Sequence, residues 1–296
     1  MIRLVLLSLF FYTAYGNICS SDIYNYGSWD SNTNTFTVTS NIPDSNQFSP
    51  SPFRNCDVFD VLEYSVVVAD SVTSIGDGAF HSDYKNVYGM TSLTIGNSVE
   101  TIGGNAFTNN GLTSLTIGNS VTFIGHSAFK GNSLTSLFIP DSVDTVEIDA
   151  FMQNSLTSVT IGNSVESILA GVFRNNALTT VDIPDSVTYI DETAFAYNAL
   201  TTLDIPDSVT YIGDNAFKDN ALTSVTTGNG LTHIGNDAFL NNPLTEFRAS
   251  GTILMKLLFG LQNVQNAVVI SNGITIIDDA SCSELKSTYT SRNCCG

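Results

Sequence analysis

Two carboxylates are the first candidates for chemistry in this chain. Asp182 and Asp204 lie 22 residues apart, and 22 residues is also the period of a repeat that fills the middle of the sequence. The two should therefore sit on adjacent turns, at a separation similar to that of the carboxylates of retaining glycosidases. General acid catalysis also needs a pocket that raises the pKa of one carboxyl, which an open strand surface does not offer. We expect solvated side chains, with attraction of a cation or a basic partner as the alternative.

The histidines add no catalytic set. His81, His126 and His233 fall at unrelated positions of the repeat. No nucleophile elbow, phosphate-binding loop or metal-ligand spacing accompanies them. The sequence therefore predicts a protein that is not an enzyme and that holds no cofactor and no metal.

The five cysteines all lie outside the regular repeats, towards the two ends of the chain. In a secreted chain this placement suggests disulfides that lock both ends. Cys19 would pair with Cys56, and Cys282 would pair with Cys294 or Cys295. The remaining thiol is either free or links two chains. A zinc site is the weaker interpretation, because there is no Cys-x-x-Cys motif and no histidine nearby.

Charge and hydropathy restrict the partner and the location. The net charge is −18, from 28 acidic and 10 basic residues, which argues against nucleic acid and anionic lipid as partners. Residues 1–16 are typical of a signal peptide, with an apolar run from Leu4 to Tyr12 and a small-x-small site at Ala14–Gly16. The later apolar segment, Thr252–Leu261, is too short to span a bilayer. We expect a secreted, extracellular or cell-surface protein without a transmembrane anchor.

One repeated unit must position these candidates. Residues 90–243 are seven consecutive copies of 22 residues, and each copy opens on the pattern L-x-x-L-x-I. The alternation predicts a strand whose apolar side chains face inward, and the Phe at position 18 of every copy should stack in the core. Positions 7 to 9 are mostly Gly-Asn-Ser or Pro-Asp-Ser, which is turn chemistry.

The second half of the unit predicts a different local structure. Positions 14 to 20, for example 213–219, have the pattern of one or two turns of helix that carry an Ala-Phe pair. Position 21 is Asn in every copy, and an inward Asn can satisfy buried backbone groups of the surrounding loops. We therefore expect a structural column made of Asn110, Asn132, Asn154, Asn176, Asn198, Asn220 and Asn242.

The full motif, L-x-x-L-x-I-P-x-S-V-x-x-I-G-x-x-A-F-x-x-N, resembles the BspA-like leucine-rich repeat. The resemblance implies an α/β solenoid, a right-handed leucine-rich-repeat coil with one parallel β-sheet face and short helical turns. Counting degenerate flanking copies, we expect about ten coils with disulfide-locked caps. The chain then divides into a signal peptide (1–16), an N-terminal cap (17–62), the solenoid (63–286) and a C-terminal tail (287–296). The last coil would begin at Gln265, with Ile274 at position 10.

Strand positions 2, 3 and 5 point outward, where a ligand could bind. Position 2 is Thr in every copy, and strands ~4.7–4.9 Å apart would turn this row into a regular field of methyls and hydroxyls. Thr suits an exposed strand, so a purely structural role is the simplest interpretation. The alternative is recognition of an ordered polymer, a glycan or ice. The candidate binding face comprises Thr113, Thr135, Phe138, Thr157, Thr160, Thr179, Asp182, Thr201, Asp204, Thr223, Glu246 and Arg248.

Function follows mainly from the resemblance, which implies an extracellular protein-interaction or adhesion surface. The partner would be an extracellular protein or a surface polymer. Phe138 is an apolar interruption of the Thr field and a plausible contact anchor. Tyr189 and Tyr211, both at position 12, could stack as a second small patch. No motif specifies a ligand or an oligomeric state.

Overall fold

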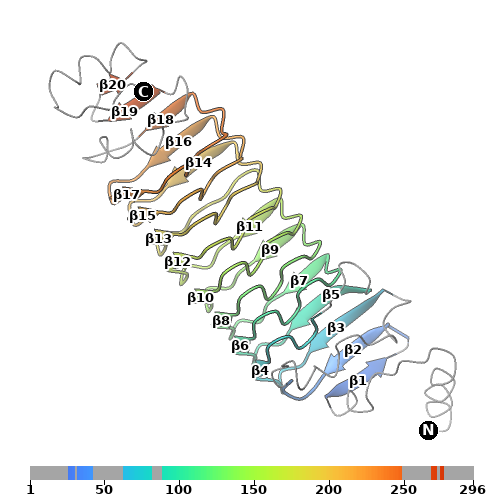
Figure 1. Cartoon of the computed structure of the whole chain (residues 1–296). Coiled ribbons are helices and arrows are strands. Elements are labelled where there is room, and N and C mark those ends of the chain that lie inside the picture. Colours follow the sequence, from blue (N-terminus) through green and yellow to red (C-terminus); the bar gives the residue numbers. More distant parts are fainter. Residues whose placement is uncertain are drawn as a thin grey trace, which may run out of the picture.

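The chain winds into a long parallel β-solenoid of about eight stacked turns in the computed structural model (Figure 1). The structure describes residues 26–30, 32–42, 63–81 and 89–248, and the strand segments 268–271 and 274–276. Among these residues there is no helix, and so none that is long and apolar enough to cross a membrane. The predicted solenoid is confirmed. Each 22-residue unit forms one coil.

The L-x-x-L-x-I pattern forms the strands of one long side, which we call the broad face. Neighbouring strands pair in parallel with the register of the repeat, for example Ser92 with Ser114 and Leu93 with Leu115. Successive side chains point to opposite sides of a strand, so Leu93 is buried and Thr94 is exposed. The strands are β3 (Tyr64–Val68), β5 (Met90–Ile95), β7 (Ser114–Thr116), β9 (Ser136–Phe138), β11 (Ser158–Thr160), β14 (Thr202–Ile205), β16 (Ser224–Thr227) and β18 (Glu246–Arg248).

A second parallel ladder runs along the opposite side, which we call the narrow face. The expectation of a single sheet face was therefore wrong. Positions 12 and 13 form strands of two residues, which are too short for an alternating sequence pattern to reveal. They are β4 (Ser74–Ile75), β6 (Thr101–Ile102), β8 (Phe123–Ile124), β10 (Thr145–Val146), β12 (Ser167–Ile168), β13 (Tyr189–Ile190), β15 (Tyr211–Ile212) and β17 (His233–Ile234).

The expected helical turns are β-turns instead, and the α part of the predicted α/β class was wrong for these residues. In segment 213–219, Lys218 donates its N–H to the Asn215 carbonyl at 3.1 Å. Asn215 and Asp219 have φ of 57° and 54°, which a right-handed helix cannot contain. The N–H groups of Asn215, Phe217 and Asp219 donate to carbonyls of the next coil at 2.8 to 2.9 Å. Hydrogen bonds between coils thus replace those within a helix.

Left-handed backbone recurs at the same two positions in all seven coils. Position 16 and position 20 are the only places in 89–248 where φ is positive. Asn and Asp tolerate this conformation better than other non-glycine residues, and they supply many of these positions. The residues are Asn105, Ser127, Asp149, Gly171, Thr193, Asn215 and Asp237, then Asn109, Gly131, Gln153, Asn175, Tyr197, Asp219 and Asn241.

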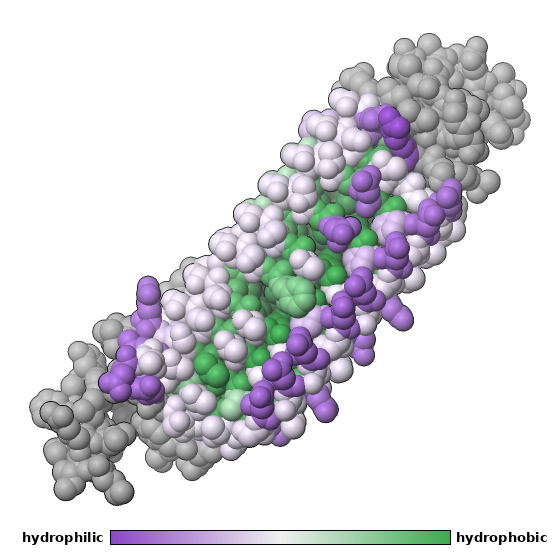
Figure 2. Space-filling view, turned by 180° about the vertical axis from the view of Figure 1, so that it is seen from behind, coloured by the Kyte–Doolittle hydropathy of each residue, from purple (hydrophilic) through white to green (hydrophobic). Residues whose placement is uncertain are grey.

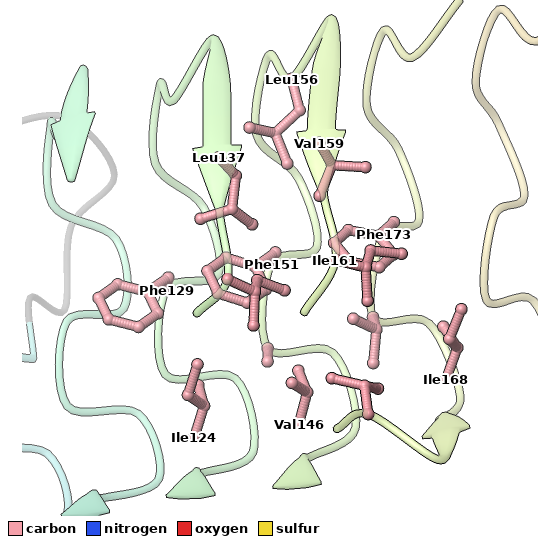
Figure 3. Close-up of a cluster of buried hydrophobic side chains, with 14 of the residues drawn as sticks. Ile124, Phe129, Leu137, Val146, Phe151, Leu156, Val159, Ile161, Ile168 and Phe173 are labelled. Carbon is pink, nitrogen blue, oxygen red and sulfur yellow. The ribbon is translucent and has the colours of Figure 1, made fainter. Parts of the chain in front are cut away.

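The Phe column fills the core between the two faces, as predicted. Phe129, Phe151 and Phe173 are at most 1% exposed, and successive rings from Phe129 to Phe173 stack with centroids 5.3 and 6.1 Å apart. Figure 3 shows these three rings in a row, between broad-face side chains such as Leu137 and narrow-face side chains such as Ile124. Burial of this column ties each coil to the next.

The Asn column is structural, as predicted. Asn132 Nδ2 donates to the Phe129 carbonyl of its own coil and to the Phe107 carbonyl of the preceding coil, both at 2.9 Å. Its Oδ1 accepts the N–H of Leu112 at 3.2 Å. One amide therefore closes its own coil and fastens that coil to its neighbour.

Antiparallel hairpins stand at both ends of the broad-face strands. At the N-terminal end β1 (Gly27–Asp30) pairs antiparallel with β2 (Thr35–Val38), which joins β3 in parallel. At the other end β19 (Val268–Ser271) pairs in parallel with β18, and β20 (Ile274–Ile276) returns antiparallel to β19. Sequence analysis places Ile274 at position 10 of a last coil, which would continue towards the narrow face. The structure instead places it in the returning strand of a hairpin. The signal peptide, the five cysteines and the tail at 287–296 lie outside the described residues.

Candidate binding face

The Thr residues at position 2 serve the fold directly. Thr113 Oγ1 donates to the Thr91 carbonyl at 3.0 Å, Thr157 Oγ1 to the Thr135 carbonyl at 3.1 Å, and Thr223 Oγ1 to the Thr201 carbonyl at 3.2 Å. These hydroxyl protons are directed at the preceding coil, so the row offers methyl groups and acceptor lone pairs to a ligand. A second row with the same bond, which sequence reasoning missed, runs beside the narrow face at position 11: Thr122, Thr188, Thr210 and Thr232.

Positions 3 and 5 are the outward rows that remain available for binding. At position 3, the hydroxyls of Ser114, Ser136 and Ser158 are exposed and make no hydrogen bond within the described part of the chain. At position 5, every side chain from Thr94 to Arg248 is exposed. Phe138 stands out among them, with 59% of its surface open to solvent.

The strand ladder of the broad face is interrupted in three places. No strand pairing joins β7 to β9 within the described residues, although β9 and β11 pair with each other. Beyond β11, segment 180–183 forms no strand, and the ladder resumes only at β14. The Thr hydroxyl bond is missing at the same places, on Thr135, Thr179 and Thr201, among the bonds of the described residues. The opening is therefore a property of particular coils.

Position 7 distinguishes the closed coils from the open ones. Coils with Gly at this position, which we call Gly coils, pair with the preceding strand; the glycines are Gly96, Gly118, Gly162 and Gly228. Coils with Pro, which we call Pro coils, do not; the prolines are Pro140, Pro184 and Pro206.

Two properties of proline disfavour the close approach of the Gly coils, the first as seen at Gly228 and the second as seen at Gly118 and Gly228. Gly228 donates its N–H to the Ile205 carbonyl at 2.8 Å, and proline has no N–H to donate. A Cβ added at Gly118 or Gly228 would lie only 2.2 or 2.4 Å from backbone atoms of the preceding coil. Proline carries that carbon, so a Pro coil must stand farther from its neighbour at this point.

Within the seven regular copies, the non-Thr residues of position 5 fall in the Pro coils. Phe138 belongs to the coil of Pro140, Asp182 to that of Pro184, and Asp204 to that of Pro206. The Gly coils carry Thr there: Thr94, Thr116, Thr160 and Thr226. Phe138, Asp182 and Asp204 therefore coincide with the openings of the ladder, whereas Glu246 and Arg248 lie on the paired strand β18.

Two apolar side chains beneath the ladder are partly accessible beside the openings, although Leu137 and Leu203 in the other Pro coils stay buried. Leu115, next to the first Pro coil, and Val181, in the second, are half-buried, whereas Leu93 and Val225 in closed parts are fully buried. A space-filling view from behind shows a hydrophobic band along the middle of the molecule, bordered by more polar rows and interrupted by isolated hydrophilic groups (Figure 2). A ligand on the broad face would thus meet an apolar floor.

Asp182 and Asp204 occupy the same position of adjacent coils, as expected, but no strand pairing joins them. Both are exposed, and neither has a hydrogen-bond or ionic partner among the described residues. Glu246 and Arg248 behave differently, because they form an ion pair with each other at 2.7 Å. An exposed pair of this kind contributes little stability.

The ring side chains of position 12 form a stack on the narrow face. Tyr189 and Tyr211 have centroids 4.5 Å apart, and His233 continues the stack at 4.4 Å from Tyr211. Sequence analysis expected the tyrosine pair and missed His233. Burial raises the pKa of Tyr189 to about 12, and the carboxylate of Asp191 adds to the shift. Within the described residues no group of acidic, His and Cys side chains could hold a metal ion.

Comparison with known proteins identifies the repeat. The model of the BspA type leucine-rich repeat region matches six copies, at residues 46–148, 73–201 and 189–293. The chain belongs to this family. No curated protein matches it.

Several solved structures are similar to this chain at low identity. A leucine-rich cell surface protein from Faecalibacterium prausnitzii is 20% identical over 87% of this chain and 94% of its own, with a TM-score of 0.44. A leucine-rich repeat protein from Bacteroides ovatus is 20% identical over 83% and 76%, with a TM-score of 0.46. The pneumococcal vaccine antigen PcpA is 16% identical over 81% and 95%, with a TM-score of 0.34.

Proposed function

We propose that the broad face of this BspA-type protein is an extracellular surface that binds another macromolecule, most directly a protein. The observation that carries the proposal is the coincidence of open ladder and distinctive side chain in the Pro coils. An exposed aromatic ring and two unpartnered carboxylates stand over a partly accessible apolar floor. Buried aromatic anchors and oriented charges are the features that dominate protein–protein interfaces.

Binding of a regular polymer, a glycan or ice through the Thr rows is the second candidate. The unbonded hydroxyls of Ser114, Ser136 and Ser158 favour it. In the Gly coils the position 2 hydroxyls are committed to the preceding coil, as those of Thr113, Thr157 and Thr223 are. This commitment weakens the second candidate, as does the interruption of position 5 by Phe138 and Asp182. Ice binding predicts thermal hysteresis and faceted ice crystals. A wild-type protein that shows neither would exclude ice as the ligand.

The location outside the cell rests on residues 1–16 and on the cysteines. We propose that the leader is removed and that Cys19–Cys56 and one C-terminal pair involving Cys282 form disulfides. Secretion of the full chain, followed by mass spectrometry of the unreduced product, tests both points. Recovery of an intact leader, or of five free thiols, would contradict this part of the proposal.

The test of the binding face uses matched sets of position 5 residues. The test variant combines Phe138→Ala, Asp182→Asn and Asp204→Asn, all in Pro coils. The control combines Thr116→Ala, Thr160→Ala and Thr226→Ala, at the same position of Gly coils. Both are compared with wild type on arrays of extracellular proteins and glycans. We expect only the test variant to bind its strongest partner with an affinity lower by about tenfold or more. Equal binding by all three proteins would refute the proposal that the broad face is the binding site.

A further inference from the structure

The acidic side chains of the broad face are uncompensated only where Pro coils adjoin. Asp141 accepts the N–H of Asn163 at 2.8 Å, and Asp207 accepts the N–H of Asn229 at 2.7 Å. Both acceptors serve a Gly coil that follows. Asp185 occupies the same position, but a Pro coil follows it, and it has no partner among the described residues. Asp185 therefore joins Asp182 and Asp204 as a third exposed carboxylate with neither a hydrogen-bond nor an ionic partner among the described residues.

The cations of the described residues lie elsewhere. Lys130, Arg174 and Lys218 all occupy position 19, in the β-turn segment, where Lys130 pairs with Asp149 at 2.8 Å. Arg248 is on the broad face but is held by Glu246. Like charges at the same position of adjacent coils repel each other, and a positively charged ligand would relieve that repulsion. The charge of the face thus points to a basic partner.

Based on the proposed function, we infer that the open part of the broad face binds an extended basic peptide segment that lies along the solenoid axis. One cationic side chain of the segment would bridge Asp182 and Asp204. An apolar side chain would pack on Phe138 and the accessible edge of the apolar floor. The segment is therefore defined by the distance between its basic residue and its apolar residue.

The dimensions of the repeat specify the spacing. Phe138 and Asp182 are two coils apart, which is about 9.6 Å at the ~4.7–4.9 Å spacing of paired strands, and somewhat more here because the second step crosses an opening of the ladder. Three residues of polyproline II helix, one full turn, also advance about 9.3 Å and return to the same side. A basic and an apolar residue three positions apart would therefore face Asp182 and Phe138 together.

Peptide backbone also suits the polar groups that the face leaves open. A polyproline II segment has no internal hydrogen bonds, so its carbonyls can accept from the unbonded hydroxyls of Ser136 and Ser158. The backbone of residues 180–183 makes no strand pairing within the described residues and can bond in the same way. A neutral glycan would satisfy the hydroxyls but would leave the carboxylates without a counter-charge.

Fluorescence anisotropy with three short, capped, proline-rich peptides tests the inference on the full mature chain. The first carries a Trp and an Arg three positions apart, the second has Glu in place of Arg, and the third has the Trp and Arg adjacent. We expect the first to bind at least about tenfold more tightly than either of the others. Its affinity should fall as salt rises, since the screening length shrinks from about 10 Å at 0.1 M to about 3 Å at 1 M.

Protein variants locate the binding. The double variant Asp182→Asn with Asp204→Asn should weaken the first peptide about tenfold, and Phe138→Ala should do the same without changing the salt dependence. Glu192→Gln, which removes an exposed carboxylate beside the narrow face, is the control and should leave binding unchanged. Equal loss in the control would show a general charge effect and overturn the site.

A panel of neutral and cationic oligosaccharides separates failure of this inference from failure of the proposed function. Suppose that an oligosaccharide binds, that the variant combining Phe138→Ala, Asp182→Asn and Asp204→Asn abolishes its binding, and that no peptide binds. The broad face is then a binding surface, but its ligand is not a basic peptide. If peptides bind equally to wild type and to the triple variant, both ideas fail.

Discussion

Gly coils and Pro coils share a core and differ at one surface. In both, the position 21 Asn donates to two Phe carbonyls, as Asn132 does in the Gly coil of Gly118 and Asn198 does in the Pro coil of Pro184. The two left-handed positions of the turns are also the same. Only the broad face changes, where the ladder closes before a Gly coil and opens before a Pro coil. One residue in 22 can therefore alter the broad face without altering the fold.

The contribution of each column Asn to stability should be the same in Gly coils and in Pro coils. Loss of one such Asn is the largest change in unfolding free energy that we expect. Asn132→Ala and Asn198→Ala each remove three hydrogen bonds, so each should lower the free energy of unfolding by about 3 kcal/mol. Urea denaturation followed by circular dichroism measures both values. A cost at Asn198 less than half of that at Asn132 would mean that the opening of the Pro coils extends into the core.

Introducing proline into a Gly coil should impose the open state at a measurable cost. Gly228→Pro removes the bond from Gly228 N–H to the Ile205 carbonyl and places a carbon against the backbone of Asp207. We expect a loss of about 2 kcal/mol in unfolding free energy, together with faster amide exchange in β14 and β16. Full stability with unchanged exchange would show that position 7 does not control the ladder.

The inward half of the molecule was predictable because each inward position repeats one requirement in every coil. The Leu, Ile and Phe positions and the Asn column follow from periodicity together with burial. The turns were misassigned because positions 14 to 20 place an Ala-Phe pair between polar residues, which a short amphipathic helix also does. The Asn, Asp and Gly at positions 16 and 20 were the available signal for left-handed backbone.

For the outward half, the sequence predicted which positions face solvent but not how far apart the coils that carry them lie. Phe138, Asp182 and Asp204 were recognised because they depart from Thr, and the structure exposes all three. Their link to Pro140, Pro184 and Pro206 was in the sequence but had no meaning until the distance between coils was known. Pro and Gly are equally good turn residues, and they differ here through contact with the preceding coil, which no single unit contains.

Removing proline from a Pro coil is the reciprocal experiment. Pro184→Gly combined with Asp185→Asn recreates the Gly-Asn-Ser turn of the closed coils, and segment 180–183 should then pair with β11. The gain in hydrogen bonds is offset by the greater freedom of glycine in the unfolded chain, so overall stability should change little. Amide exchange of Val181 and Asp182 should slow by about tenfold, which corresponds to ~1.4 kcal/mol of local opening free energy.

That variant should also lower the affinity of any ligand that binds the broad face, because closing the ladder covers Val181. The double variant Thr160→Ala and Asn163→Ala, in a neighbouring Gly coil, serves as its control. Slower exchange with unchanged ligand binding would separate the opening from function and leave the side chains at position 5 as the determinants.

The smallest expected effect compares two threonines of one row. Thr157 lies in a Gly coil and donates its hydroxyl proton to the Thr135 carbonyl at 3.1 Å, whereas Thr179 lies in a Pro coil and has no such bond among the described residues. Substitution by Val keeps the shape and removes the hydroxyl. Thr157→Val should therefore cost about 0.5 kcal/mol of unfolding free energy, and Thr179→Val should cost nothing. Equal costs would mean that the Thr row contributes to stability by packing alone, and the hydroxyls of the closed coils would then be free to bind a ligand.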